Sequence, residues 1–165
     1  MAWATNQAGD AARDAGDPAA ARALYERSLS TFRELSDQGG VVSALSDLAR
    51  LARREGDLPR AKAVCREALA LGAIGSQRAE ALLIEEVAAL AAASHDPRRA
   101  LVLFAAAAGL RGRLGWPVPA SERPARERLI QDQRAALGAE AVAAWSQGWR
   151  LDAVEAMSFA RGLFE

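Results

Sequence analysis

The sequence predicts an all-α fold, a solenoid of three helix pairs with a C-terminal helical cap, and two observations lead to this prediction. The first is composition: Ala occurs 41 times among 165 residues, and residues that favour helices far outnumber β-branched ones. The second is a pattern that recurs along the chain. Since 51% of the residues are hydrophobic, a disordered chain is excluded.

The recurring pattern predicts a helical hairpin in each copy. Gly16 and Gly56 lie 40 positions apart, and His95 takes the equivalent place 39 positions later. Asp follows each of them, and Pro follows within two further residues. Gly ends a helix in the left-handed conformation, Asp caps the next helix, and Pro fits its first turn. Two further sets of residues align between the copies: Ala21, Ala61 and Ala100, and Tyr25, Cys65 and Phe104.

The three hairpins are expected at about 2–36, 41–71 and 77–114, and residues 1–114 form one stacked array. Small residues of the first helices, such as Gly9, let neighbouring helices approach closely. One hairpin cannot bury its apolar side alone, so stacking supplies the core. The extra length of each copy is expected in the links 36–40 and 71–76.

The C-terminal cap is expected at 115–165. Gly115 to Pro119 breaks the helix. Ser121 is expected to cap a helix that ends at Gly138. A short helix is expected near 140–149, and Asp152 with Glu155 predicts a capping box that opens the last helix.

The Gly-Asp turn, followed by the aligned Ala and then Tyr25 or Phe104, resembles the tetratricopeptide repeat. The resemblance covers about 3–114, with copies longer than the usual length of about 34 residues. Repeats of the HEAT kind also fit the spacing, but the turn favours the tetratricopeptide type. The resemblance implies a non-enzymatic module that binds proteins or peptides.

The tail carries a second resemblance, to the end of the repeat region in bacterial LuxR-type and related signalling ATPases. It rests on residues 103–111, Gly115 to Pro119, residues 135–141 and 145–152. This resemblance implies a regulatory, sensing role in a bacterial transcription regulator, and the chain is expected to be its C-terminal piece or a stand-alone remnant. No phosphate-binding loop is present, and the only Lys is Lys62, so ATP hydrolysis is not expected.

Composition and sequence patterns argue against some classes of partner and some cellular locations. The formal net charge is zero, which argues against direct nucleic-acid binding. No apolar run is long enough to cross a membrane, and the N-terminus lacks a secretory signal. The single Cys65 cannot form an internal disulfide. A cytoplasmic protein without cofactor or metal is therefore expected.

The first helices are expected to line a concave groove that holds a peptide or a segment of a partner protein. Arg50, Arg53 and Arg54 form a basic patch suited to a carboxylate. Lateral ion pairs of Asp10 with Arg50 and of Asp14 with Arg54 are the favoured alternative, whereas Arg53 aligns with Arg13 and Ala92 and is the charge most expected to face a ligand. The residues expected to contact the partner are Trp3, Asn6, Arg13, Ser43, Ser46, Arg50, Arg53, Arg54, Leu82 and Glu85.

No catalytic residue is expected. His95 is interpreted as a turn residue, Cys65 as core, and Glu80, Glu85 and Glu86 as a solvated helix face. Trp116, Trp145 and Trp149 are expected to pack the tail onto the last repeat. Apolar surface around Trp3, Ala4 and Ala8 suggests self-association through the N-terminal edge, and so a possible homodimer. The rival hypothesis is a small-molecule receptor or enzyme with a pocket between repeats and cap, holding Glu85, Arg53 and His95.

Overall fold

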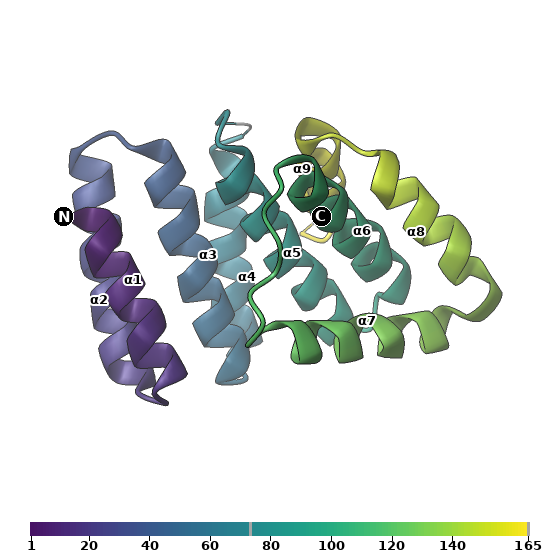
Figure 1. The fold of residues 1–165 in the computed structure, drawn as a ribbon, viewed down its shortest axis with the longest axis horizontal. Helices are drawn as coiled ribbons and strands as arrows, with labels where there is room; N and C mark the ends of the chain where they lie inside the picture. The colour runs from purple at the N-terminus through teal and green to yellow at the C-terminus, as the bar shows by residue number, and fades with distance from the viewer. Residues whose placement is uncertain (73, 165) are drawn as a thin grey trace. The chain divides into compact units, whose positions relative to one another are not determined.

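The structure, a computed structural model, describes residues 1–72 and 74–164 (Figure 1). Ala73, in the second expected link, and Glu165, in the expected cap, lie outside the described residues. The described residues contain helices and no β-strand, so the all-α prediction is confirmed. The helices are α1 Ala2–Asp14, α2 Pro18–Glu34, α3 Gln38–Arg54, α4 Leu58–Ala70, α5 Gln77–Ala93, α6 Pro97–Arg113, α7 Arg123–Leu137, α8 Ala141–Arg150 and α9 Ala153–Arg161, with a short 3₁₀ helix at Gly138–Glu140.

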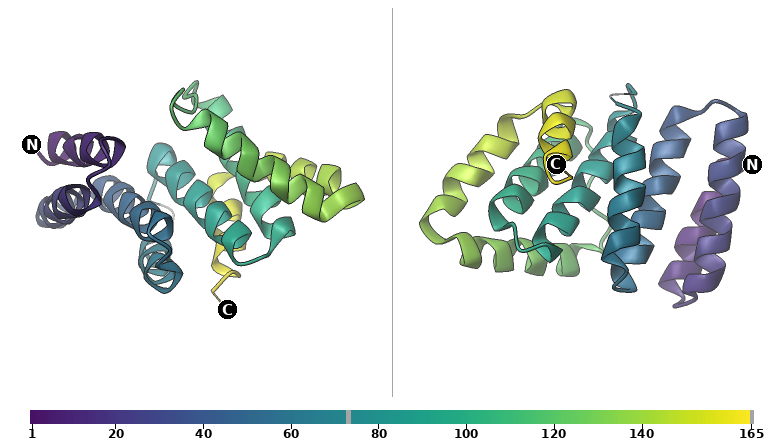
Figure 2. Two further views of the ribbon diagram at one scale, coloured as in Figure 1. Left: turned by 90° about the horizontal axis from the view of Figure 1, so that it is seen from below. Right: turned by 180° about the vertical axis from the view of Figure 1, so that it is seen from behind.

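The chain forms two compact units, Met1–Ala79 and Glu80–Glu165. In the first unit α1 packs on α2, α2 on α3 and α3 on α4, and α1 also touches α3. Successive helices of this unit run in opposite directions, as the right-hand view in Figure 2 shows. In the second unit α6 contacts α7, α8 and α9, and α7 runs across the direction of α6 (Figure 1).

The three predicted turns share one backbone conformation. Gly16, Gly56 and His95 have φ values of +81°, +82° and +59°. The Asp after each of them caps the next helix by accepting a hydrogen bond of 2.9–3.0 Å from a backbone N–H three residues on. At His95 a side chain with a Cβ adopts the left-handed region that favours glycine.

The aligned core residues occupy equivalent buried positions. Ala21, Ala61 and Ala100 are fully buried near the start of α2, α4 and α6. Four residues further on, Tyr25, Cys65 and Phe104 are also buried. The interpretation of Cys65 as a core residue is therefore confirmed, and the equivalence of the copies extends from the turns into the core.

Two glycines permit close helix contacts. A Cβ on Gly9 of α1 would lie 2.6 Å from the Tyr25 ring of α2. A Cβ on Gly148 of α8 would lie 1.9 Å from the carbonyl oxygen of Val102 in α6. Both distances are shorter than van der Waals contact, so any larger residue would push these helices apart.

Some boundaries differ from the prediction. The helix α3 begins at Gln38 rather than at 41, because Asp37 caps it by accepting from Gly40 N–H at 2.9 Å. Part of the extra length of this copy thus lies in a helix rather than in a link. Ser121 does not cap α7, which begins at Arg123 after Glu122 without a side-chain cap. Gly138 ends α7 as predicted, and the capping box of Asp152 and Glu155 is present.

Within the described residues, no helix combines the length and the apolar character that crossing a membrane requires.

Candidate functional site

The first helices of the N-terminal unit meet at a buried polar contact. Asn6 of α1 is 4% exposed and donates a hydrogen bond from Nδ2 to Oδ2 of Asp47 in α3, at 2.8 Å. The hydroxyl of Ser28 in α2 lies 2.9 Å from Oδ1 of Asn6 and 2.8 Å from the carbonyl oxygen of Tyr25. Asn6 therefore connects three helices, because its amide offers both a donor and an acceptor.

A second polar contact lies one helical turn along α1. The hydroxyl of Tyr25 donates to Oδ1 of Asp10 at 2.9 Å, and Nη1 of Arg13 donates to the same oxygen at 3.0 Å. Arg13 also donates from Nε to Asp14 at 3.0 Å. Burial alone would lower the pKa of Arg13, but Tyr25, Asp10 and Asp14 outweigh it and raise that pKa. Burial also raises the pKa of Tyr25, and the carboxylates of Asp47 and Asp10 add to the effect.

Asp47 is the most perturbed acid of this group. Its side chain lies 3.8 Å from Nη1 of Arg50, one turn further along α3. Burial raises the pKa of Asp47 to about 6, although Arg50 and the hydrogen bond from Asn6 oppose the rise. Burial away from water disfavours the charged form of this carboxyl group, and the two donors offset part of that cost.

Several residues expected to line the groove are in fact buried. Asn6, Ser43, Ser46 and Arg50 are at most 8% exposed, and Ser46 donates to the carbonyl oxygen of Val42 in its own helix at 2.7 Å. The side chain of Arg13 is only 5% exposed. For these five residues direct contact with a partner is not supported, because a ligand would first have to displace the contacts of the core.

Other expected groove residues remain accessible. Trp3 is 49% exposed and meets Phe32 edge to face, with ring centroids 4.8 Å apart. Arg54 is exposed and Arg53 half-buried. The ion pairs seen for Asp10 and Asp14 are with Arg13 of their own helix. The lateral pairs with Arg50 and Arg54 stay predictions.

The expectation of a solvated face at Glu80, Glu85 and Glu86 is wrong. Glu80 and Glu86 are each 2% exposed. Glu85 of α5 is shared by two arginines of the C-terminal unit: Arg111 of α6 donates to Oε2 from Nε at 2.9 Å and from Nη2 at 2.8 Å, and Arg126 of α7 donates to Oε1. Leu82, on the same helix, is half-buried.

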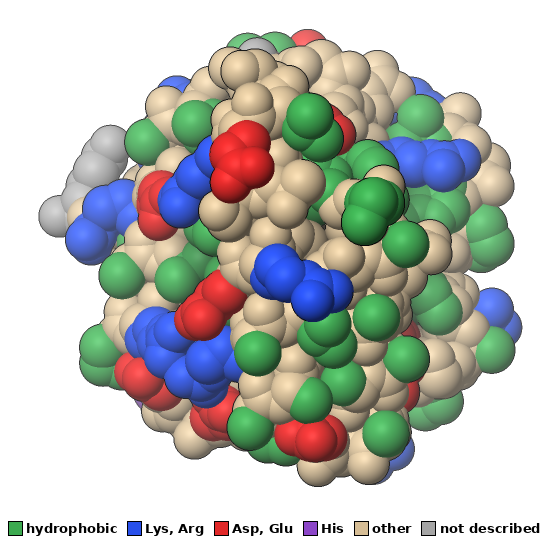
Figure 3. Space-filling view, turned by 90° about the vertical axis from the view of Figure 1, so that its left-hand side faces the viewer, with side chains coloured by type: hydrophobic (Ala, Val, Ile, Leu, Met, Phe, Trp, Pro, Cys, Tyr) green, Lys and Arg blue, Asp and Glu red, His purple; other side chains and the backbone are tan. Residues whose placement is uncertain are grey.

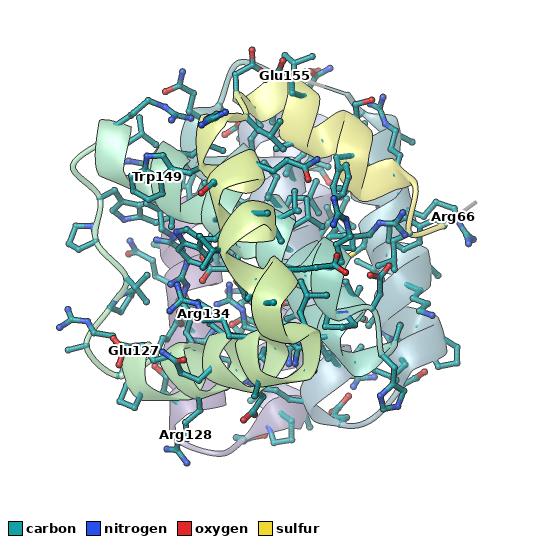
Figure 4. All side chains as sticks on the ribbon, turned by 90° about the vertical axis from the view of Figure 1, so that its right-hand side faces the viewer. Arg66, Glu127, Arg128, Arg134, Trp149 and Glu155 are labelled. Atoms are coloured by element: carbon teal, nitrogen blue, oxygen red, sulfur yellow. The ribbon has the colours of Figure 1, made fainter. Side chains whose placement is uncertain are left out.

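The remaining candidates from the sequence are His95, Trp145 and Trp149. His95 is exposed in the turn between α5 and α6, as its interpretation predicted. Trp145 stacks under the guanidinium of Arg134 at 4.7 Å, whereas Trp149 is 50% exposed on the face drawn in Figure 4. In the part of the chain that the structure describes, no group of three or more His, Cys, Asp or Glu side chains is arranged to hold a metal ion.

The polar partners of the N-terminal unit and the arginines around Glu85 were missed from the sequence. Asp47 carried a usable signal, because a single acid within the apolar stretch 41–52 indicates a buried partner. The sequence gives no signal for the contacts of Arg111 and Arg126 with Glu85, since these residues lie 26 and 41 positions from Glu85 along the chain.

The arrangement in the N-terminal unit joins α1 to α3 and leaves Trp3 and Arg54 exposed at its surface. In comparisons with known proteins, the family model described as tetratricopeptide repeat matches residues 1–72. No curated protein and no solved structure matches the chain significantly. The helix pairs α1–α2 and α3–α4 are thus similar to tetratricopeptide repeats, and the predicted all-α fold with tetratricopeptide-like helix pairs is confirmed.

Proposed function

We propose that the chain is a non-enzymatic protein-interaction module that holds a peptide, or a segment of a partner protein, against α1 and α3. The observation that carries the proposal is the similarity of residues 1–72 to a repeat whose stacked first helices form a binding face. The buried contact of Asn6 with Asp47 supports it, because a ligand then meets a pre-organised surface.

The accessible side chains set the size and chemistry of the ligand. Trp3 lies near the start of α1, and Arg53 and Arg54 lie at the end of α3. Since α1 and α3 run in the same direction, these two groups are separated by about ten residues of helix, or about 15 Å. An extended peptide of about five residues covers that length. An apolar side chain would lie on Trp3 and a carboxylate on the arginines.

A library of short peptides with free C-terminal carboxylates tests this proposal. The tightest binder should lose about tenfold or more in affinity with Trp3→Ala and with Arg53→Glu, measured by fluorescence anisotropy. Arg27→Glu, an exposed change on α2, is the matched control and should leave the affinity unchanged. The proposal fails if no peptide is enriched, or if the three variants bind equally well.

We further propose that the module is the regulatory part of a bacterial signalling ATPase of the LuxR-type, working in the cytoplasm. The resemblance of residues 103–152 to the end of such repeat regions supports this context. The genomic reading frame around the coding sequence tests it: an adjoining segment that encodes a nucleotide-binding domain supports the proposal, and an unrelated neighbour on both sides opposes it.

The N-terminal edge is also proposed as a site of self-association. Trp3, Ala4 and Ala8 are exposed on α1, and the face seen in Figure 3 carries small hydrophobic patches separated by acidic and basic side chains. Sedimentation equilibrium should show a dimer that Ala8→Arg weakens. If the protein stays monomeric at every concentration, self-association through this edge is contradicted.

A small-molecule receptor is the second candidate function, and one observation favours it. A cavity lies between α6 of the last repeat and the first helix of the expected cap.

A further inference from the structure

A cavity of about 410 Å³ lies within the C-terminal unit, between the end of α6, the link 114–122 and α7. Its lining includes Ala108, Arg111 and Gly112 of α6, Trp116 and Val118 of the link, and Arg126 of α7. The volume falls in the range of pockets that hold small organic ligands.

Arg111 lines this cavity and carries a buried donor. The residue is 4% exposed, and two of its nitrogens bind Glu85. Its third nitrogen, Nη1, is buried and has no hydrogen-bond partner among the described residues. A guanidinium N–H left without an acceptor in a buried place is costly. An acceptor brought by a ligand would remove that cost.

The charges around the cavity favour an anion. Arg111 and Arg126 share the single carboxylate of Glu85, so these three side chains together carry one positive charge. Arg126 also reaches the carbonyl oxygen of Phe104 from Nη2 at 3.5 Å. Arg123, in the first turn of α7, donates to the carbonyl oxygen of Val118 at 3.4 Å. A carboxylate is the anion whose planar shape matches guanidinium groups.

The rest of the lining is largely apolar. The ring of Trp116 stacks on the guanidinium of Arg111, with 4.1 Å between the guanidinium carbon and the ring centroid. This contact holds the guanidinium in one orientation. Ala108, Pro117 and Val118 add apolar surface beside it.

We propose that this cavity binds a small molecule with one carboxylate and an apolar body, such as an aryl or short-chain carboxylic acid. The carboxylate accepts from Nη1 of Arg111, and the apolar body lies against Val118 and Pro117. The site is in the C-terminal unit, so it does not depend on the peptide-binding surface proposed for α1 and α3.

Titration of the ¹⁵N-tryptophan-labelled protein with phenylacetate tests the proposal by NMR. The indole signal of Trp116, assigned by its loss in Trp116→Phe, should shift in a saturable way. The neutral analogue phenylacetamide should bind with an affinity at least about tenfold lower, because it lacks the charge that Arg111 recognises. A peptide ending in a free Phe carboxylate, titrated in parallel, shows whether a free acid or a chain terminus is preferred.

Two variants separate binding from folding. Val118→Trp fills the cavity without touching the ion pairs of Glu85, and it should abolish the phenylacetate shift while the protein still melts cooperatively. Arg111→Lys keeps the charge but loses the planar fork, and it should weaken binding about tenfold. The matched control is Arg113→Gln, two residues along α6, where the side chain is exposed and binds the carbonyl oxygen of Leu151; its binding should equal that of the wild type.

Three results would overturn the proposal. The acid and the amide could shift Trp116 equally, the shift could survive Val118→Trp, or Trp116 could fail to respond to both phenylacetate and the peptide acid. The last result would mean that the cavity does not hold an acid against Nη1 of Arg111.

Discussion

Asn6 and Asp47, 41 positions apart in the sequence, are joined by a buried hydrogen bond of 2.8 Å that connects the first helices of two successive hairpins. The bond lies inside the N-terminal unit, where Ser28 also contacts Asn6. The alignment of the first hairpin against the second therefore depends on specific polar groups as well as on apolar packing.

Asp47→Asn should change how stability depends on pH. Burial raises the pKa of Asp47 from 3.8 in the unfolded chain to about 6 in the folded one, so the folded state binds this proton more tightly. Between about pH 4 and pH 6 the contribution of Asp47 to the free energy of unfolding falls as pH rises. Urea unfolding across this range should show the wild type losing about 2 kcal/mol relative to the variant. Parallel profiles for the two proteins would contradict the assigned burial effect.

Gly56→Val should destabilise the protein by about 1–3 kcal/mol, since φ at Gly56 is +82° and a β-branched residue is strained there. Thermal melting measures the loss. Gly112→Ala is the matched control, because Gly112 lies within α6 and a Cβ there meets no atom within 4 Å. The control should be neutral or slightly stabilising. Equal melting temperatures for Gly56→Val and wild type would disprove the turn assignment.

His95→Gly should have the opposite effect. His95 holds a φ of +59° at the position where the other two turns have glycine. Relief of that strain outweighs the larger conformational entropy that glycine brings to the unfolded chain, with a net gain of about 0.5 kcal/mol. The melting temperature should rise by one or two degrees, and a fall would show that the His95 side chain makes stabilising contacts of its own.

Glu85→Ala should cost about 3 kcal/mol, because it leaves the guanidiniums of Arg111 and Arg126 without their shared carboxylate in a largely buried place. Chemical denaturation gives the measurement. Glu127→Ala, at an exposed position of α7 labelled in Figure 4, should change stability by less than about 0.5 kcal/mol. A similar small effect at Glu85 would mean that its ion pairs are screened by solvent.

The local features of the fold could be predicted from the sequence. The turns at Gly16 and Gly56, the caps at Asp17 and Asp57, and the alignment of Tyr25 with Cys65 follow from residue types at fixed spacing. Each depends on neighbours within a few positions, where conformational preferences act directly.

The features that join distant segments could not be predicted in this way. Periodicity places Glu85 on a helix but does not show that Arg111 and Arg126 meet it, so the acid was assigned to solvent. The sequence predicts that Asn6 faces a ligand for the same reason. A polar residue in a groove and a polar residue paired with a buried Asp47 have the same sequence pattern, and only the position of the neighbouring helix distinguishes them.

The repeat architecture depends on the equivalence of the helix pairs, and a matched substitution series tests that equivalence most directly. Ala21, Ala61 and Ala100 are all fully buried near the start of α2, α4 and α6. Ala→Leu at each position, measured by chemical denaturation, should destabilise the protein by a similar amount of about 1–3 kcal/mol, because a closely packed site cannot take three more carbons. Ala4→Leu, at an exposed position of α1, should cost less than about 0.5 kcal/mol. If any of the three buried changes were as harmless as Ala4→Leu, the helix pairs would not be equivalent and the repeat architecture would be contradicted.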